Sequence, residues 1–512
     1  MARKTRKPAQ RVEPATLPAA PVPGSSAPLR LLVALTAALF AARIYAAGKV
    51  GFGDSEALYA SYAVHPQPAY LDHPGLIGQV ARLVGGGSAP APESAHYVTA
   101  VVATLVPWLV VAVARVAGTS LSPALVAGAV VAVVPEIAVG LFGLTPDLLL
   151  APLWLGAIGL AIAGLTHGRP IALLGAGLLA GVAASAKVSG LLLFAALAFV
   201  HLRAPRERRT IWPWAGFVAG GIVLLPIALW EARSGFPMLR HRFVETQSGA
   251  GIALRNVGQL VGGQLVYLSP AACYLAFVVA RDLVRRRDED AVTRVLFATF
   301  AIPFVPLLLL CVWSPIAEPH WIAPALLALP IHAARRAVVT ASQVKLTLGV
   351  AGAFTLLAHA WVLVPASARL RPTDVDAKAD IASELYGWPA AAEAIKEQRM
   401  LAATPADPNG EDVVLVGPHW TVCAQLQAAF PRAKVGCATP VPDDFDRWYP
   451  RERWKAAAEV LFVTDNRFDG DGAAELPLLS RFSQSKVRIF RGGRPARVFE
   501  LYLYARRGQA AL

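Results

Sequence analysis

The chain has 512 residues, of which 55% are hydrophobic and only 16% are charged. A soluble domain carries about 25% charged residues, and the apolar residues here fall in runs long enough to cross a bilayer. The runs 98–114 and 122–134 lack the polar face that a soluble helix needs. The composition therefore excludes a soluble protein and indicates a polytopic all-α membrane protein.

The net charge of +14 comes from basic residues that gather in short clusters between the apolar runs. Such clusters mark the cytoplasmic loops of membrane proteins. A nucleic-acid groove would interleave basic residues with aromatic ones, and the sequence lacks this pattern. We therefore expect the membrane bilayer as a partner and no nucleic acid.

Residues 1–28 are rich in Lys, Arg, Pro and Ala, which predicts a disordered basic cytoplasmic tail. Residues 29–367 form the predicted transmembrane domain. Its apolar segments, about eleven in number, are 29–47, 96–115, 121–143, 147–165, 170–184, 188–203, 211–230, 257–280, 291–313, 321–334 and 345–366. With a cytoplasmic N-terminus, this count places every basic cluster on the cytoplasmic side.

The first predicted outer loop, residues 48–94, has two stretches with the pattern of short interfacial helices, 55–64 and 76–84. The tail, residues 368–512, is more charged and alternates strand-like and helix-like stretches. It is long enough to fold alone, which predicts a small periplasmic α/β domain.

Within this tail we expect strands at 413–417 and 460–464, a helix at 420–430, and a terminal hairpin around 492–493. Cys423 and Cys437 also lie there. A disulfide between them is possible if the tail is outside the cytoplasm, but the sequence does not give their separation.

The predicted outer side is rich in ionisable side chains. They are Asp54, Glu56, Asp72, His73, Asp147, Lys187, Glu231, Arg233, Arg240, His241, Arg242, Glu245, Arg255, Glu318 and His320. If they converge, they form one cavity that holds both carboxylates and cations. This mixture suits sugar transfer from a lipid phosphate, because the leaving phosphate needs Lys or Arg and the acceptor hydroxyl needs a carboxylate.

Asp54 follows Gly53 near the membrane edge, where a carboxylate is costly unless it binds or reacts with something. If this stretch is extended, Asp54 and Glu56 face the same side. The alternative is that Asp54 caps a helix that starts near Ser55.

The other candidates also have structural alternatives. Lys187 lies between two apolar runs on the outer side, against the positive-inside trend, and a snorkelling lysine would explain it as well. Asp147 suits a helix start, and Asp72 with His73 suits a turn before Pro74.

Arg240 and Arg242 lie outside against the same trend, although a solvated charge run is a simpler explanation. Glu318 and His320 could supply a base, or could merely flank an interfacial tryptophan, Trp321. No His-x-x-x-His or Cys-x-x-Cys spacing occurs, so no fixed metal site is indicated, and a divalent metal ion stays a possible cofactor.

Several motifs occur in the order of a known family. They are Asp54-Ser-Glu56-Ala-Leu-Tyr59, Pro68-Ala-Tyr70-Leu-Asp72-His73-Pro74, Thr145-Pro-Asp147, Ser185-Ala-Lys187, Glu318-Pro-His320-Trp321 and Tyr386-Gly-Trp388. The pattern resembles the bacterial branch of the dolichyl-phosphate-mannose–protein mannosyltransferases (family 39, GT-C fold), which are similar to the aminoarabinose lipid A transferases. The resemblance implies a polyprenyl-phosphate-linked sugar donor, an inverting transfer and a catalytic aspartate, here Asp54.

The resemblance also implies that Lys187, Arg240 and Arg242 contact the donor phosphate. We add Glu56 to the catalytic group. The predicted substrate-binding residues are Tyr59, Tyr70, Asp72, His73, Asp147, Glu318 and His320.

The predicted function is thus a multi-pass glycosyltransferase of the bacterial inner membrane, with a protein, lipid A or another glycan as acceptor. A transporter or flippase for lipid-linked sugars is the alternative. Such a protein should have polar residues in the middle of several helices, whereas the middle positions of the apolar segments in this chain are apolar. A non-catalytic scaffold whose tail binds a partner is the third possibility.

Overall fold

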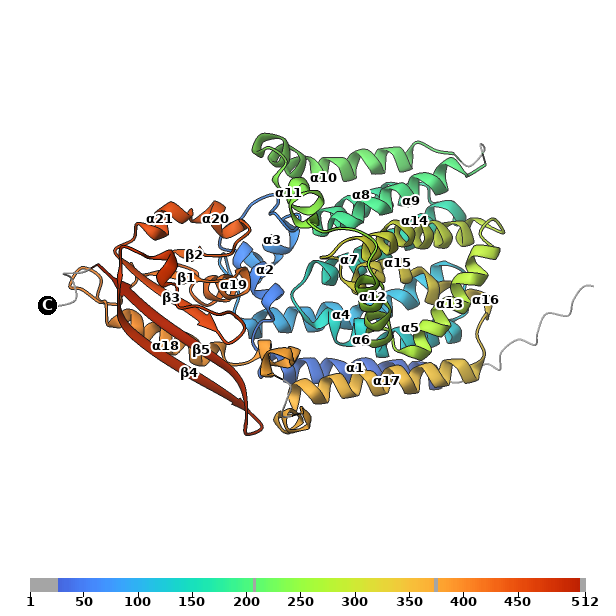
Figure 1. The fold of residues 1–512 in the computed structure, drawn as a ribbon. Helices are drawn as coiled ribbons and strands as arrows, with labels where there is room; N and C mark the ends of the chain where they lie inside the picture. The colour runs from blue at the N-terminus through green and yellow to red at the C-terminus, as the bar shows by residue number, and fades with distance from the viewer. Residues whose placement is uncertain (1–25, 206–208, 373–375, 507–512) are drawn as a thin grey trace, which may run out of the picture.

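In the computed structural model of the chain, residues 26–205, 209–372 and 376–506 are described. They form a helical bundle and a C-terminal region built on a single sheet (Figure 1). Of the tail predicted at 1–28, residues 1–25 lie outside the described part.

The bundle is built from twelve main helices. They are α1 (Ala27–Ala47), α4 (Pro92–Val116), α5 (Leu121–Val133), α7 (Pro146–Thr166), α8 (Ala172–Ala186), α9 (Leu191–Leu202), α10 (Trp212–Ser234), α12 (Leu254–Tyr267), α13 (Pro270–Arg285), α14 (Ala291–Trp313), α16 (Ala328–Arg336) and α17 (Ala341–Leu363). The short helices α6 (Pro135–Ala138), α11 (Pro237–Phe243) and α15 (Ala323–Leu326) connect them.

Fewer helices than predicted are long enough to cross a bilayer. In the described residues, six helices are long and apolar enough to span a bilayer. The number is up to eight if each of two bent helix pairs forms one span. The α5–α6 pair bends by 72° and the α12–α13 pair by 102°. Pro135 and Pro270 begin the second member of each pair, and a proline disrupts the helical hydrogen bonds before it. The chain is a polytopic helical membrane protein with several short or broken helices.

The end of the short helix α6 leaves backbone carbonyls that need donors. The buried Arg43 of α1 supplies them, since its guanidinium donates to the carbonyl oxygens of Ile137 at 2.8 Å and Ala138 at 3.0 Å. Irregular backbone at membrane depth is stable only when the protein satisfies it in this way.

Helices α8 and α10 approach each other closely along glycines. Gly177 and Gly181 of α8 face Gly216 and Gly220 of α10, and an added Cβ on Gly177 would lie 2.4 Å from the Gly216 backbone. Small residues at this spacing allow membrane helices to pack backbone against backbone.

Loops predicted to be cytoplasmic meet at the end of the bundle remote from the sheet (Figure 1). Arg335 donates to the carbonyl oxygen of Ala117 at 2.9 Å and to Asp290 at 3.0 Å. Arg336 also binds Asp290, at 2.5 Å. Three loops that are distant in sequence therefore share one end, as the basic clusters predict.

The C-terminal region contains a five-stranded sheet of order β2-β1-β3-β5-β4. Its strands are β1 (Val414–Gly417), β2 (Val435–Cys437), β3 (Glu459–Asp465), β4 (Ser480–Arg491) and β5 (Arg494–Ala505). β1 is parallel to β2 and β3, whereas β5 is antiparallel to β3 and β4. The two expected strands and the hairpin are confirmed, and so is the expected helix, α19 (Trp420–Ala429).

A disulfide joins Cys423 of α19 to Cys437 of β2, with the Cα atoms 5.9 Å apart. The pairing that the sequence left open is therefore present. It fixes α19 to the edge of the sheet.

Two short helices of the first loop, α2 (Asp54–Tyr62) and α3 (Leu76–Val84), lie between the bundle and the sheet (Figure 1). They match the two helices expected at 55–64 and 76–84 in position. α19 packs against α2, and the side chain of Gln425 donates to the carbonyl oxygen of Phe52 at 2.8 Å. The first loop and the C-terminal region therefore share one core.

A second contact anchors the sheet to the end of α17. The turn between β4 and β5 lies against the residues that follow this helix, and an added Cβ on Gly492 would lie 2.2 Å from the carbonyl oxygen of Pro365. Arg369 donates to the carbonyl oxygen of Gly492 at 2.8 Å. Gly492 also has a φ of +58°, which favours glycine.

Candidate active site

Glu56 fixes the start of α2. Its carboxylate accepts hydrogen bonds from the backbone N–H of Gly53 at 3.0 Å and of Leu144 at 2.7 Å, and contacts His96 Nε2 at 3.0 Å. The capping that we considered for Asp54 is thus performed by Glu56.

Residues 54–62 are helical, as expected for 55–64, so the condition under which Asp54 and Glu56 would face the same side is not met. Side chains two residues apart on a helix do not face each other, so Asp54 and Glu56 diverge. The contacts of Glu56 favour a positioning role over a catalytic one.

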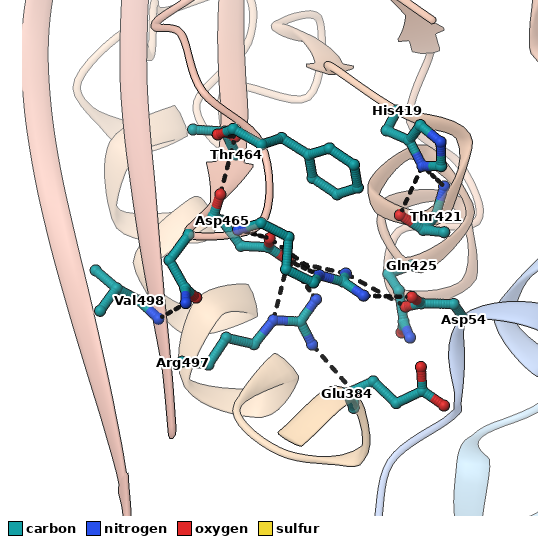
Figure 2. A network of polar contacts seen from close by, with 12 residues as sticks. Asp54, Glu384, His419, Thr421, Gln425, Thr464, Asp465, Arg497 and Val498 are labelled. Carbon is teal, nitrogen blue, oxygen red and sulfur yellow. Dashed lines mark hydrogen bonds and ion pairs between the residues drawn. The ribbon is translucent and has the colours of Figure 1, made fainter. Parts of the chain in front are cut away.

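Asp54 points instead to the C-terminal region, where it meets a cation. Its carboxylate pairs with Arg467 through both oxygens, Oδ2 to Nη1 at 2.5 Å and Oδ1 to Nη2 at 3.5 Å. Asp465 holds the same guanidinium at 2.9–3.1 Å, and Arg497 donates to Asp465 from Nε at 3.0 Å. Charges therefore alternate from β5 to α2 (Figure 2). Burial alone would lower the pKa of Arg467, but its bonds to Asp465 and Asp54 raise it.

Glu384 lies beside this chain of charges (Figure 2). Its Oε1 is 3.3 Å from the place where a Cβ on Gly53 would be, and its carboxylate makes no hydrogen bond within the described residues. Burial, and then the charge of Asp54, raise the pKa of Glu384 to about 7. Asp54, Glu384, Asp465, Arg467 and Arg497 are called the seam cluster below.

A second group of charges borders a cavity of about 310 Å³ at the end of the bundle that faces the sheet. Five residues of its lining, Asp72, His73, Lys187, Arg242 and Trp321, are called the cavity cluster below, and the polar side chains of Ser189 and Gln247 line it as well. The remaining wall is mostly apolar and comes from α9, α11 and α14. It includes Leu191, Leu192, Met238, Leu239, Phe243, Pro306, Leu307 and Leu310.

Lys187 ends α8 and turns inward. Its Nζ donates to both carboxylate oxygens of Asp147, at 2.9 and 2.7 Å, and lies 5.9 Å from the ring centroid of Trp321. Only 9% of the Lys187 side chain is exposed, so it does not snorkel to water. Behind this pair, His320 lies 3.5 Å from Asp147 and 3.1 Å from Glu318.

Arg242 is the second cation of the cavity. It donates from Nε to the carbonyl oxygen of Asp72 at 2.9 Å, lies 3.3 Å from His73 Nε2, and packs over Trp321 at 5.5 Å. Burial, and then the nearby charges of Arg242 and Lys187, hold the pKa of His73 well below its usual range. The ring of Tyr59 lies 5.4 Å from that of His73.

Eight of the twelve predicted site residues lie outside this cavity border, Arg240, Tyr70 and Glu318 among them. Arg240 is 68% exposed and faces Glu245 at 3.7 Å, as in a solvated charge run. The Tyr70 hydroxyl donates to the carbonyl oxygens of Tyr62 and His65 and so stabilises the loop. Glu318 is 62% exposed and forms an ion pair with His320.

Asp54 is also absent from the cavity border. It begins α2, and Tyr59, which touches the cavity cluster, comes five residues later, about 7.5 Å along the helix axis. The single pocket expected from the sequence is therefore divided into two clusters at the two ends of one helix.

The seam cluster contains residues that sequence reasoning missed: Glu384, Asp465, Arg467 and Arg497. Asp465 is the last residue of β3 and Arg467 follows it, at the carboxyl end of a parallel strand pair, where α/β proteins often bind ligands. The strand itself was predicted, but the contact between Arg467, just after it, and Asp54 of α2 gave no signal in the sequence. Within the described residues, no three His, Cys, Asp or Glu side chains are placed to hold a metal ion.

Residues 81–230 match a family model described as dolichyl-phosphate-mannose-protein mannosyltransferase. The matched range includes Asp147 and Lys187. This stretch, less than a third of the chain, is similar to that mannosyltransferase family. The match identifies the chain as a membrane glycosyltransferase of the polyprenyl-phosphate-sugar-dependent kind. No curated protein matches the chain in sequence.

Solved structures share the fold of this chain at low sequence identity. ArnT from Cupriavidus metallidurans bound to undecaprenyl phosphate is similar with a TM-score of 0.61 and 14% identity, over 93% of this chain and 98% of ArnT. ArnT in the apo state is similar with a TM-score of 0.59 and 16% identity, over 92% of this chain and 97% of ArnT. The apo oligosaccharyltransferase of Archaeoglobus fulgidus is similar with a TM-score of 0.54 and 11% identity, over 88% of this chain and 71% of that enzyme. The chain thus has the GT-C fold of these enzymes.

Proposed function

We propose that this glycosyltransferase moves a sugar from a polyprenyl phosphate to an acceptor hydroxyl, with inversion, and that Asp54 is its catalytic carboxylate. The observation that carries the proposal is the arrangement at the end of the bundle that faces the sheet. A buried carboxylate and a two-cation cavity lie at opposite ends of α2, a helix of nine residues.

The cavity cluster suits the donor's phosphate. Lys187 keeps a third N–H donor after its two bonds to Asp147, and Arg242 offers a planar fork that suits phosphate. The apolar wall suits the first isoprene units of the donor lipid. The bound undecaprenyl phosphate in the similar ArnT structure supports this assignment.

The transfer step needs an acceptor oxygen in front of Asp54. The carboxylate accepts the proton as this oxygen bonds to the anomeric carbon, and the bond from that carbon to the phosphate oxygen breaks with its electron pair. A carboxylate has about four lone-pair sites, and Arg467 occupies two of them. Lys187 and Arg242 stabilise the charge on the departing polyprenyl phosphate.

The end of the bundle that faces the sheet corresponds, in this proposal, to the periplasmic side of a bacterial inner membrane. The basic loops at the opposite end support a cytoplasmic assignment for that end. The Cys423–Cys437 disulfide supports a periplasmic C-terminal region.

The variant Asp54→Asn tests the mechanism, because it keeps the shape of the side chain and removes its proton-accepting charge. In a strain lacking the chromosomal copy, we expect at least a 1,000-fold loss of transfer, roughly the upper range for a lost general base. Polyprenyl-phosphate-linked sugar should then accumulate. Mass spectrometry of lipid extracts measures this accumulation and also gives the mass of the attached sugar.

Asp412→Asn is the matched control, since Asp412 is exposed and forms an ion pair with Lys434 at 3.4 Å, far from either cluster. Purified Asp54→Asn protein should bind undecaprenyl phosphate as tightly as the wild type. Near-normal transfer by a folded Asp54→Asn protein would overturn the proposed role of Asp54.

A further inference from the structure

The hydrogen-bonded group of Arg467, Arg497 and Asp465 carries one excess positive charge toward α2. The two guanidinium groups share one carboxylate, that of the buried Asp465. One guanidinium charge therefore needs an anion from outside this group, and the carboxylate of nearby Glu384 makes no hydrogen bond to it within the described residues. Asp54, from the membrane part, supplies it, and only 8% of this residue is exposed.

This ion pair is not needed to dock the two regions. Gln425 already binds the carbonyl oxygen of Phe52, and the carboxylate of Asp444 accepts from the backbone N–H of Leu71 at 3.1 Å. The turn at Gly492 adds a further contact at the end of α17. Arg467 can thus serve a purpose other than holding the interface together.

The geometry of Arg467 is fixed from behind. Asp465 accepts hydrogen bonds from Nε and Nη2 of Arg467. This leaves Nη1 and the second N–H of Nη2 for Asp54. Asp465 is in turn held by Arg497 of β5. A fork anchored in this way fixes both the position and the orientation of the carboxylate that it binds.

We propose that Arg467 is a positioning residue of the transfer site: it holds the Asp54 carboxylate in one position and one orientation, so that the C-terminal region completes the active site. This inference rests on the proposed catalytic role of Asp54. It assigns the C-terminal region a direct part in transfer.

The test compares Arg467→Ala, Arg467→Lys and Gln425→Ala in the full-length protein. Each purified variant is added to a detergent extract of membranes from the deletion strain, which supplies the accumulated donor and the unused acceptor. We expect Arg467→Ala to lose about 100-fold in transfer rate, the cost of a misplaced catalytic group. Arg467→Lys should recover part of this loss, because it restores the charge without the fork. Gln425→Ala, which removes a neighbouring interdomain bond, should stay within about threefold of the wild type.

Two further measurements separate positioning from a merely structural role. Guanidinium ion added to Arg467→Ala should restore transfer at least tenfold, and should not change the rate of Gln425→Ala. Undecaprenyl phosphate, used as the binding probe, should bind Arg467→Ala and wild type equally, because Arg467 does not border the cavity.

Transfer by Arg467→Ala within threefold of the wild type, while Asp54→Asn is inactive, would overturn this inference and leave the proposed function intact. A loss that guanidinium does not relieve would also overturn it. If Arg467→Ala does not fold, Arg467→Lys decides: a tenfold or greater loss with unchanged undecaprenyl phosphate binding supports positioning, and an unchanged rate overturns it. Full activity of Asp54→Asn would remove both proposals.

Discussion

The cavity cluster and the seam cluster lie at the two ends of α2 but are built differently. Every member of the cavity cluster comes from the membrane part, and its two cations face an apolar space. The seam cluster combines one aspartate of the membrane part with four residues of the C-terminal region, which bind mainly one another. The first arrangement suits an amphiphilic ligand, and the second suits a carboxylate that must stay in place. The following experiments test whether the two clusters are as separate as this comparison suggests.

The largest effect is expected from Lys187→Met. This variant leaves the Asp147 carboxylate, whose side chain is only 16% exposed, without its closest cation, which costs about 3 kcal/mol in the free energy of unfolding. It should also weaken undecaprenyl phosphate binding more than tenfold, measured by native mass spectrometry.

The double variant Lys187→Met/Asp147→Asn serves as the control. It should regain most of the thermal stability, since no unpaired charge remains, but not the affinity for undecaprenyl phosphate. Recovery of both properties would show that Lys187 is only a structural partner of Asp147.

Removal of the disulfide should affect the seam cluster alone. The double variant Cys423→Ser/Cys437→Ser removes a disulfide between residues that are 14 positions apart in the sequence. A disulfide that closes a loop of about this length contributes about 3 kcal/mol to the free energy of unfolding. We expect faster proteolysis of the C-terminal region and slower transfer, with unchanged binding of undecaprenyl phosphate.

Cys273→Ala, which removes a free cysteine of the bundle, should leave proteolysis unchanged. Equal loss of undecaprenyl phosphate binding and of transfer in the disulfide variant would contradict the separation of the two clusters.

The smallest effect is expected at Glu384. Its pKa is raised from 4.5 to about 7 by burial and then by the charge of Asp54. The folded protein therefore holds a proton that the unfolded chain has lost between these pH values. The stabilising contribution of the protonated form is complete below about pH 4.5 and is lost as the pH rises through 7.

Glu384→Gln stays neutral at every pH and should raise the melting temperature at pH 8.5 by an amount equivalent to about 2 kcal/mol. The gain should vanish near pH 4.5. Glu393→Gln, a change of a 69% exposed side chain on α18 (Trp388–Met400), should show no such pH dependence. A gain of equal size at both pH values would show that the effect does not come from the titration of Glu384.

The sequence revealed the cavity cluster better than the seam cluster, for a physical reason. Lys187 and Arg242 stand out because cations on the outer side of a membrane protein are exceptional. Arg467 stands in a charged tail where cations are ordinary, and its partner Asp54 is 413 residues away. Hydrophobic runs located the helices of the bundle, but run length alone could not show that prolines bend α5–α6 and α12–α13.

The turn at Gly492 has a practical consequence for handling the protein. Because it fits against the backbone after α17 with no room for a Cβ, epitope insertion at this loop tip should uncouple the sheet from the bundle. The last strand, β5, runs from this turn to Ala505 at the far side of the sheet (Figure 1). An affinity tag at the carboxyl terminus therefore leaves the contact of the turn with the bundle undisturbed. Such a tag offers a route to purify enzyme with both clusters intact.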